Sequence, residues 1–159
     1  MSPDESGENT IKEYDRIPVR QLREDDLEAI VRIDQRITGR ARRDYFALKL
    51  KEALKDTRVR VSLGAEMDGH LAGFLMGKLY YGEFGVPDPI AILDTIGVDP
   101  MRKGQGVGKA LLSQFCTNLR GMGIEKVQTQ AGWNEWQLLR FLDASGFKPA
   151  ARVCLEVTI

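Results

Sequence analysis

The chain has 159 residues, of which 43% are hydrophobic and 29% are charged, a composition that suits a globular protein with one buried core. Lysine plus arginine equals aspartate plus glutamate at 23 each, so no overall basic field favours nucleic acid as a partner. Residues 1–14 are polar and acidic and lack the apolar run of a leader peptide or membrane helix. We therefore expect a flexible polar tail over 1–15, one folded domain over 16–159 and no membrane partner.

The chain contains two cysteines, Cys116 and Cys154, which fall in a predicted helix and a predicted strand. They lack the spacing of metal ligands, and no secretory segment accompanies them. We therefore expect reduced thiols, no bound metal and a cytoplasmic location.

Alternation of apolar and polar residues with a period of two predicts strands in several segments. Asp68-Gly69 lies between two of them and is the strongest short signal of a hairpin turn. The segment 151–159 alternates without interruption and is predicted as the last strand. The predicted strands are 16–22, 58–66, 71–81, 90–98, 126–131 and 151–159.

Four other segments place apolar residues at helical spacing. Gly39 ends the first of them, and the third follows a glycine-rich loop directly. Asn134 can cap the fourth, which Gly146 ends. The predicted helices are 25–38, 42–54, 107–121 and 134–144.

The segment 90–112 carries the strongest functional signal, because an apolar strand runs into three alternate glycines and then into an amphipathic helix. Gly104, Gly106 and Gly108 lack a Cβ, so the backbone can turn tightly and approach a ligand closely. The free N–H groups of the following helix and the positive end of its dipole favour a phosphate or pyrophosphate. A lysine on each side adds positive charge.

Spacing distinguishes the known loops of this kind. A nucleotide-triphosphate P-loop needs G-x-x-x-x-G-K-[ST], but the interval from Gly104 to Lys109 is one residue too short and Ala110 replaces the magnesium-binding hydroxyl. A dinucleotide loop needs G-x-G-x-x-G near the start of a βαβ unit, whereas this G-x-G-x-G lies about two-thirds of the way along the chain. A glycine-rich turn that binds nothing is the remaining structural alternative.

The loop resembles the acyl-coenzyme A loop of the GNAT superfamily of N-acetyltransferases, which reads [QR]-x-x-G-x-[GA] after a strand ending in Val-x-Pro. Here Val98-Asp99-Pro100 precedes Lys103-Gly104-Gln105-Gly106-Val107-Gly108, with Lys103 in the place of Gln or Arg. The order of predicted elements, β-α-α-β-β-β-α-β-α-β, is similar to that fold from Ile17 onwards. The resemblance implies an α/β fold of the mixed α+β kind, with a mostly antiparallel sheet of six to seven strands, a splayed central pair and four flanking helices.

The resemblance also implies acetyl-coenzyme A as a cosubstrate, without a metal. Its pyrophosphate is expected on the glycine loop and its pantetheine arm on backbone groups of the strand before the loop. Asn134 looks like the asparagine of the family's "N…GF" segment, which helps to hold the coenzyme, although simple capping also explains it. The implied coenzyme-binding residues are Ile96, Gly97, Val98, Lys103, Gly104, Gln105, Gly106, Val107, Gly108, Lys109 and Asn134.

The implied chemistry is transfer of an acetyl group to a primary amine of a small molecule or peptide, by direct attack in a ternary complex. The amine must lose a proton, and the oxyanion needs a donor, for which the family uses a backbone N–H near Ile96. Many relatives protonate the departing thiolate with a tyrosine at the position that is Leu142 here. This departure motivates a second hypothesis, a coenzyme A-binding module with little turnover that acts as a sensor or partner protein.

The candidate catalytic residues are Asp94, Tyr80 and Tyr81. Asp94 lies where many relatives carry an acidic base, and an aspartate satisfied by neighbouring backbone groups is equally consistent with the sequence. One of the two tyrosines is the nearest candidate proton donor. We expect the acceptor pocket to form from the connection 38–45 and the loop 80–89, because loops on a rigid scaffold carry specificity. The candidate substrate-binding residues are Arg40, Arg43, Tyr45 and Glu83.

Two tryptophans, Trp133 and Trp136, bracket Asn134. They could stack against a ligand or a second subunit, and core packing accounts for at least one of them. A homodimer is therefore an open expectation, and the identity of the acceptor amine is not determined by these residues.

Overall fold

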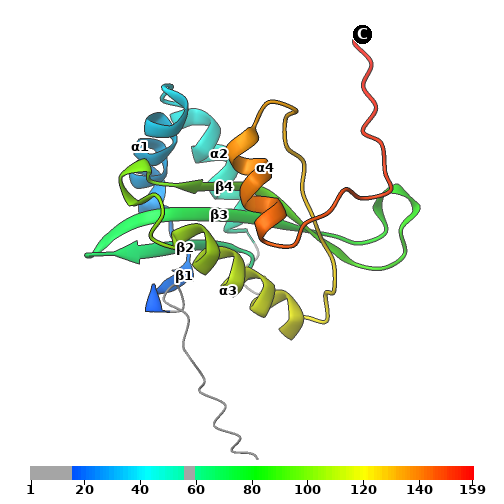
Figure 1. The fold of residues 1–159 in the computed structure, drawn as a ribbon, viewed down its shortest axis with the longest axis horizontal. Coiled ribbons are helices and arrows are strands. Elements are labelled where there is room, and N and C mark those ends of the chain that lie inside the picture. The colour runs from blue at the N-terminus through cyan, green and yellow to red at the C-terminus, as the bar shows by residue number, and fades with distance from the viewer. Residues whose placement is uncertain (1–15, 56–59) are drawn as a thin grey trace, which may run out of the picture.

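A five-stranded sheet with helices on both faces forms the protein in a computed structural model, which describes residues 16–55 and 60–159 (Figure 1). The expected tail over 1–15 and the first two residues of the predicted strand 58–66 lie outside the described residues. The strands are β1 (Val19–Gln21), β2 (Ser62–Met67), β3 (His70–Tyr80), β4 (Ile90–Val98) and β5 (Val127–Gln128). The helices are α1 (Leu27–Thr38), α2 (Arg43–Ala53), α3 (Val107–Gly121) and α4 (Trp136–Ala144).

The sheet is mixed. Its order is β1-β2-β3-β4-β5, with antiparallel pairing from β1 to β4 and parallel pairing between β4 and β5. The turn between β2 and β3 is made by Asp68 and Gly69, both with positive φ, which confirms the hairpin predicted from that pair.

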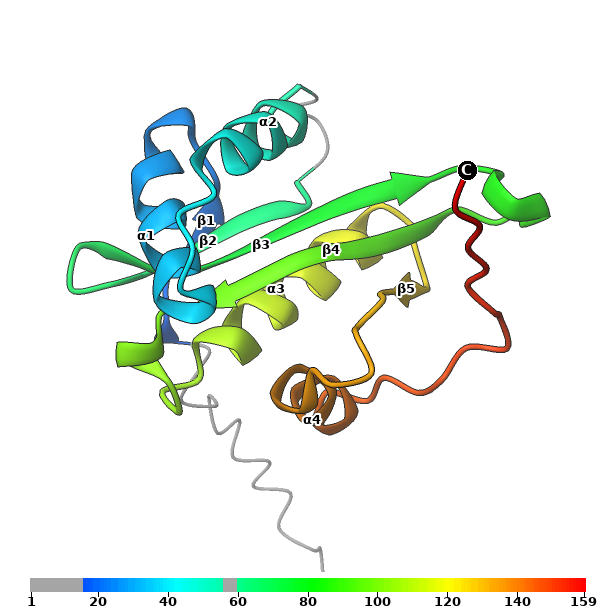
Figure 2. The same cartoon turned by 90° about the horizontal axis from the view of Figure 1, so that it is seen from above.

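The two faces of the sheet carry separate apolar cores, because successive side chains of a strand point to opposite faces. Helices α1 and α2 cover one face, and α3 and α4 cover the other (Figure 2). Phe74 and Met76 of β3 point toward α1 and α2, whereas Leu75 of the same strand points toward α3. Each helix therefore buries only one side, and within the described residues none has the length and apolar character needed to cross a bilayer.

Helix α3 lies unusually close to β3, because two glycines of that strand face it. A Cβ placed on Gly73 would lie 2.8 Å from Cγ1 of Val107, and one placed on Gly77 would lie 2.5 Å from Cε2 of Phe115. Both distances are shorter than real Cβ contacts allow. The side chains of α3 thus occupy the space that the missing Cβ atoms leave.

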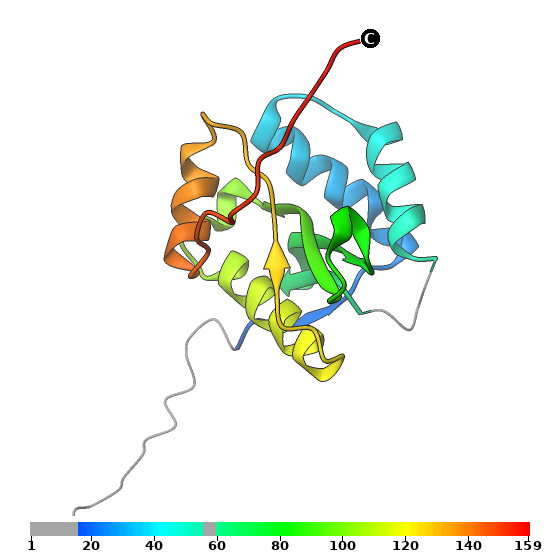
Figure 3. The same ribbon diagram turned by 90° about the vertical axis from the view of Figure 1, so that its right-hand side faces the viewer.

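The expectation of six to seven strands is wrong, because the described residues form five. The segment 151–159 has the predicted alternation but no neighbouring strand, and it extends away from the domain with Val153, Leu155 and Val157 between 81% and 87% exposed (Figures 1 and 3). Alternation makes a segment suitable for a sheet, whereas a strand also needs a partner for its N–H and C=O groups. The predicted strand 126–131 shortens to β5 because the chain beyond Gln128 separates from β4.

We expect Gly77→Ala to destabilise the fold by about 1–3 kcal/mol, the usual range for overpacking. The new methyl group would meet the ring of Phe115 and also the backbone oxygen of Val61, at 2.7 Å, which cannot move freely. Gly121→Ala is the matched control, because a Cβ at that helical position has no atom within 4 Å. Urea unfolding measures both variants, and equal stability of the two would contradict the packing argument.

Candidate active site

The turn between β4 and α3 is fixed by Asp99, immediately after β4. Its backbone N–H donates to the carbonyl of Ala72 at 2.8 Å, and its Oδ1 accepts from the N–H of Met101 at 3.0 Å. Its second carboxylate oxygen, Oδ2, accepts from Nη1 of Arg36 on α1 at 2.6 Å. The start of the glycine loop is therefore held to β3 and to α1 at once.

The glycine loop presents unpaired N–H groups at the start of α3. Gly104 and Gly106 have φ values of 79° and 87°, the left-handed region that glycine adopts without strain. The first N–H of the helix to find a carbonyl partner is that of Ala110, which donates to Gly106 at 2.9 Å. The N–H groups of residues 107–109 have no protein acceptor among the described residues and lie at the positive end of the helix dipole. This arrangement suits a phosphate or pyrophosphate.

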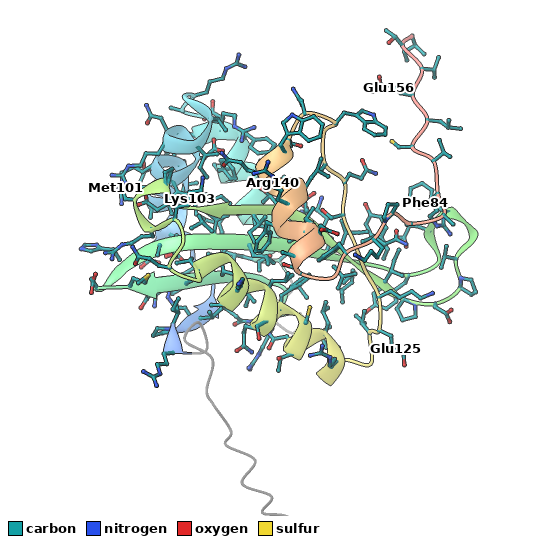
Figure 4. All side chains as sticks on the ribbon, in the orientation of Figure 1. Phe84, Met101, Lys103, Glu125, Arg140 and Glu156 are labelled. Atoms are coloured by element: carbon teal, nitrogen blue, oxygen red, sulfur yellow. The ribbon has the colours of Figure 1, made fainter. Side chains whose placement is uncertain are left out.

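Gly108 has a structural role besides its place in the loop. A Cβ there would lie 3.1 Å from Cε2 of Phe141, so the missing side chain allows α4 to pack against the first turn of α3. Arg140 precedes Phe141 on α4, is exposed and was not among the sequence candidates; Figure 4 labels it and Lys103 of the loop.

Strands β4 and β5 separate after two paired residues, which opens one edge of β4. The strands pair only at Ala91 and Ile92, while β4 continues to Val98. The N–H of Ala91 donates to the carbonyl of Lys126, so its backbone points toward β5. In an antiparallel pair, the backbone groups of successive residues point alternately toward the partner strand and away from it. When the bulge is counted, Ile96 and Val98 point away from β3, as Ala91 does. Their N–H and C=O groups therefore point into the open edge. This edge can bind an extended ligand arm as another strand would.

Asp94 is the extra residue of a β-bulge. Met76 pairs with Thr95 and Gly77 with Leu93, so Asp94 has no partner on β3. A bulge redirects a side chain and is common beside active sites. The Asp94 carboxylate points toward α2, where Oδ2 accepts a short hydrogen bond from Nζ of Lys49, and its Oδ1 lies 3.8 Å from Nζ of Lys78.

Asp94 favours the protonated form of Lys49. Burial alone would lower the pKa of Lys49, but the hydrogen bond and negative charge of Asp94 outweigh it, so the pKa is raised. Tyr45 lies on the same helix, with its ring 5.6 Å from Nζ of Lys49 and 5.0 Å from the Arg42 guanidinium carbon. Lys49 was not among the sequence candidates, since a lysine on a helix usually faces solvent.

The structure brings together only part of the predicted acceptor set. Asp94 and Tyr45 meet through Lys49, whereas Tyr80 lies three residues beyond Gly77 on β3, about 10 Å along the strand. Tyr81 is 66% exposed, and Glu83 lies in the exposed loop after it. Neither tyrosine is therefore placed beside the bulge.

The two arginine candidates differ in their surroundings. Arg43 pairs with Glu28 at 2.8 Å on the surface, away from β4. Arg40 follows the end of α1, where Cδ1 of Ile37 lies 3.5 Å from the position of a Cβ on Gly97. The connection that carries Arg40 thus begins on the α1 side of the sheet, near the end of β4.

One residue of the last helical region, Asn134, differs from expectation. Asn134 is exposed and does not cap α4, which begins at Trp136 after Glu135. Leu142 is buried in the core beneath α3, so it contributes packing.

Thr129, which sequence reasoning missed, donates its hydroxyl to the carbonyl of Leu93 at 2.7 Å, at the point where β4 and β5 separate. Within the described residues, no group of three or more side chains is suited to hold a metal ion.

Residues 20–147 match the family model described as Acetyltransferase (GNAT) family. The chain belongs to the GNAT acetyltransferase family. The mixed five-stranded sheet and the four helices described above are therefore a GNAT fold.

Known proteins similar to this GNAT chain include acetyltransferases with different named substrates. A mycothiol acetyltransferase from Thermobispora bispora is 31% identical over 83 residues, which cover 52% of this chain and 28% of that protein. The chain thus spans little more than a quarter of the curated relatives that it matches.

Solved structures share the GNAT fold at lower identity. Aminoglycoside N-acetyltransferase AAC(6')-Iy in complex with CoA has a TM-score of 0.74 at 20% identity, covering 89% of this chain and 94% of that chain. The ribosomal-protein-alanine N-acetyltransferase from Brucella melitensis biovar Abortus 2308 has a TM-score of 0.69 at 20% identity, covering 90% of this chain and 99% of that chain. These likenesses establish the fold and do not transfer a substrate.

We expect Lys109→Glu to weaken coenzyme A binding about tenfold or more, because it places a negative charge in the first turn of α3 beside the bound phosphates. Lys109 is exposed, so the fold should tolerate the change. Lys51→Glu, an exposed charge reversal on α2, is the control. Calorimetry at two salt concentrations measures both, and wild-type affinity in Lys109→Glu would place the phosphates elsewhere. Gly108 is a poorer probe because its replacement would also disturb Phe141.

Proposed function

We propose that this protein transfers an acetyl group from acetyl-coenzyme A to a primary amine of a small molecule or peptide, by direct attack in a ternary complex. The observation that carries the proposal is the continuity of three features on one strand: the Asp94 bulge, the open edge after it and the glycine loop at its end. We place this reaction in the cytoplasm as part of the same proposal.

The free N–H groups at residues 106–109 would hold the pyrophosphate, with Lys103, Gln105, Lys109 and Arg140 around it. The backbone groups of Ile96 and Val98 would pair with the amides of the pantetheine arm, and Gly97 lies between them. When bound, the coenzyme supplies an acyl group activated as a thioester. In this proposal the reactive end of such an arm would lie toward the bulge, because the other end would be held at the loop.

The backbone N–H of Ile96 is the donor that the strand offers to a developing oxyanion. It points into the open edge, and no acceptor among the described residues contacts it. A fixed backbone dipole in a water-poor cleft stabilises new negative charge without reorganising. The β-bulge contributes here as well, since the additional residue turns Ile96, in place of Thr95, toward the open edge.

Asp94 is the proposed proton acceptor, working through water. Lys49 remains a cation and cannot remove a proton from the incoming amine, so Asp94 is the anionic group at the bulge. The ion pair with Lys49 orients the carboxylate and also competes with a positively charged amine for it. The Asp94 carboxylate could attract the protonated amine and then accept its proton through water.

The departing thiolate would receive its proton from solvent or from the ammonium group formed in the attack. Leu142 fills the core, so no side chain of α4 replaces the tyrosine of relatives at that position. Tyr80 and Tyr81 lie away from the bulge, which weakens the earlier assignment of this role to either of them. The Thr129 hydroxyl, where β4 and β5 separate, can order a water on this path.

The second candidate function is a coenzyme A-binding module with little turnover, and the buried Leu142 favours it. Thiol release in the presence of acetyl-coenzyme A and a panel of amines distinguishes the two. The panel should include cationic aminoglycosides, peptides with free α-amines and amines that also bear a carboxylate. Release with any amine supports the enzyme, whereas tight coenzyme binding without release from the whole panel supports the module.

We expect Asp94→Asn to lower kcat/KM by roughly 10²–10⁴-fold, because it removes the basicity and keeps the size of the side chain. The low-pH limb of the activity profile should move as well. Asp25→Asn, which removes an exposed ion pair with Arg23, is the control, and thermal unfolding corrects for the loss of the Lys49 ion pair. A loss below about tenfold with an unmoved limb would return Asp94 to a structural role.

We expect Arg40→Ala to raise the KM of an acceptor amine that carries an anionic group by about tenfold, the effect of one charge-assisted hydrogen bond of about 1.5 kcal/mol. Coenzyme affinity should stay unchanged. Arg43→Ala removes the same group from a surface ion pair with Glu28 and should change neither constant. Steady-state kinetics test this, and a parallel loss of coenzyme affinity would assign Arg40 to the coenzyme site.

A further inference from the structure

A pocket that the proposed reaction does not use lies between α1, the hairpin of β2 and β3, and the turn that follows β4. Its volume is about 490 Å³, which is in the usual range for small-molecule sites. Met101, labelled in Figure 4, marks the turn beside α1. No residue of the stretch 103–109 lines the pocket, so it is adjacent to the proposed coenzyme site but separate from it.

The pocket combines an apolar wall with an excess of positive charge. The wall includes Ile33 of α1, Leu71 of β3, Met67 and Met101. The charged lining residues are three arginines and one aspartate: Arg32, Arg36, Arg102 and Asp99. Apolar surface beside guanidinium groups suits a small anion that has an apolar body.

Two of the three arginines are available to such an anion. Arg36 already donates to Asp99 at 2.6 Å. Arg32 has no ion-pair partner in the part of the chain that the structure describes. Arg102 pairs with Asp68 at 2.8 Å, but the Asp68 side chain is 75% exposed on the hairpin turn, and a surface pair of this kind contributes little. A carboxylate fits the planar fork of a guanidinium, so it is the anion that this lining favours.

We propose that this pocket binds a small carboxylate with an apolar body, and that its occupant strengthens coenzyme A binding at the glycine loop. Arg32 lies on α1, and Arg102 ends the turn that leads into the loop. A carboxylate held by both would join α1 to the loop, as the pair of Arg36 and Asp99 already does. A loop that is fixed beforehand loses less freedom when the coenzyme binds. The effect on the coenzyme rests on the proposed function, whereas the carboxylate site does not.

Methionine methyl groups test where the carboxylate binds. Met67 and Met101 line the pocket, whereas Met122 follows the end of α3. In protein labelled with ¹³C-methyl methionine, titration with hydrocinnamate should shift the NMR signals of Met67 and Met101 and leave that of Met122. Hydrocinnamamide has the same size without the charge and should bind about tenfold more weakly or worse. Shifts that persist with saturating coenzyme A exclude binding of the carboxylate at the glycine loop.

Arg32→Ala tests the charge that the pocket supplies. It should weaken hydrocinnamate binding about tenfold, the effect of one charge-assisted hydrogen bond. Arg120→Ala is the control, because it removes an exposed arginine from the last turn of α3 and should leave the affinity unchanged. Thermal unfolding checks that both variants fold.

Calorimetry with coenzyme A tests the link between the two sites. Saturating hydrocinnamate should raise the affinity for coenzyme A about fivefold in the natural sequence, at the low end of the usual range for coupled sites, and should have no effect in Arg32→Ala. Because coupling is reciprocal, coenzyme A should raise the affinity for hydrocinnamate by the same factor.

The possible failures are distinguishable. Equal Met67 shifts with the amide, unchanged affinity in Arg32→Ala, or no binding of hydrocinnamate up to about 10 mM would overturn the carboxylate site. Unchanged coenzyme A affinity with the carboxylate bound would overturn the link between the sites. A chain that binds hydrocinnamate but not coenzyme A would contradict the proposed function, and with it the link, while supporting the carboxylate site.

Discussion

The close packing of α3 on β3 is the constraint on which the site depends. Gly73 and Gly77 leave room for Val107 and Phe115, and a methyl group at either glycine would push the helix away from the sheet. The helix axis is thereby fixed relative to β4, the neighbour of β3. Its first turn, with the free N–H groups, consequently lies at the end of β4, where Asp99 connects the loop to β3 and α1. An anion site made of backbone groups requires this rigidity, since no flexible side chain can correct a displaced helix.

The bulge at Asp94 gives β4 two functions at adjacent positions. Before the bulge, the strand has regular pairing with β3 and a short parallel pairing with β5. At the bulge, one side chain points toward α2, and the backbone beyond it changes which residues point into the open edge. A regular strand would direct the backbone of Thr95 to that edge. One inserted residue therefore joins the charged side chain of the proposed acceptor side to the backbone edge proposed for the coenzyme.

The proposed acceptor side contains two lysines beside its one carboxylate, so it differs from a site with a lone carboxylate base. Asp94 is held by Lys49, and Lys78 is close enough to add a weaker attraction, so the cluster has a net positive charge. We therefore propose that an acceptor amine bearing a negative group is preferred over a polycation, whereas one structure that shares the fold is an aminoglycoside acetyltransferase in complex with sisomicin. The buried Leu142 removes the usual proton donor and leaves water as the simplest replacement.

The sequence by itself determined the local features whose cause lies within a few residues. The hairpin at Asp68-Gly69 follows from turn chemistry, and the glycine loop follows from the spacing of three glycines between a strand and a helix. The order of helices and strands followed from periodicity, and the family followed from the resemblance of that order and of the glycine-loop motif. The helix after Asn134 was also predicted, although its first residue was placed two positions too early.

Only the tertiary structure decided the features that depend on partners distant in sequence. The bulge at Asp94 depends on how β4 pairs with β3. The contact between Asp94 and Lys49 depends on the packing of α2 against the sheet. Gly108 is as much a packing residue for Phe141 as a loop residue, which its spacing could not reveal. The segment 151–159 has the alternation of a strand, but alternation describes one chain segment and pairing requires two. Alternation alone therefore could not predict the number of strands, because the folded structure determines which segments pair through backbone hydrogen bonds.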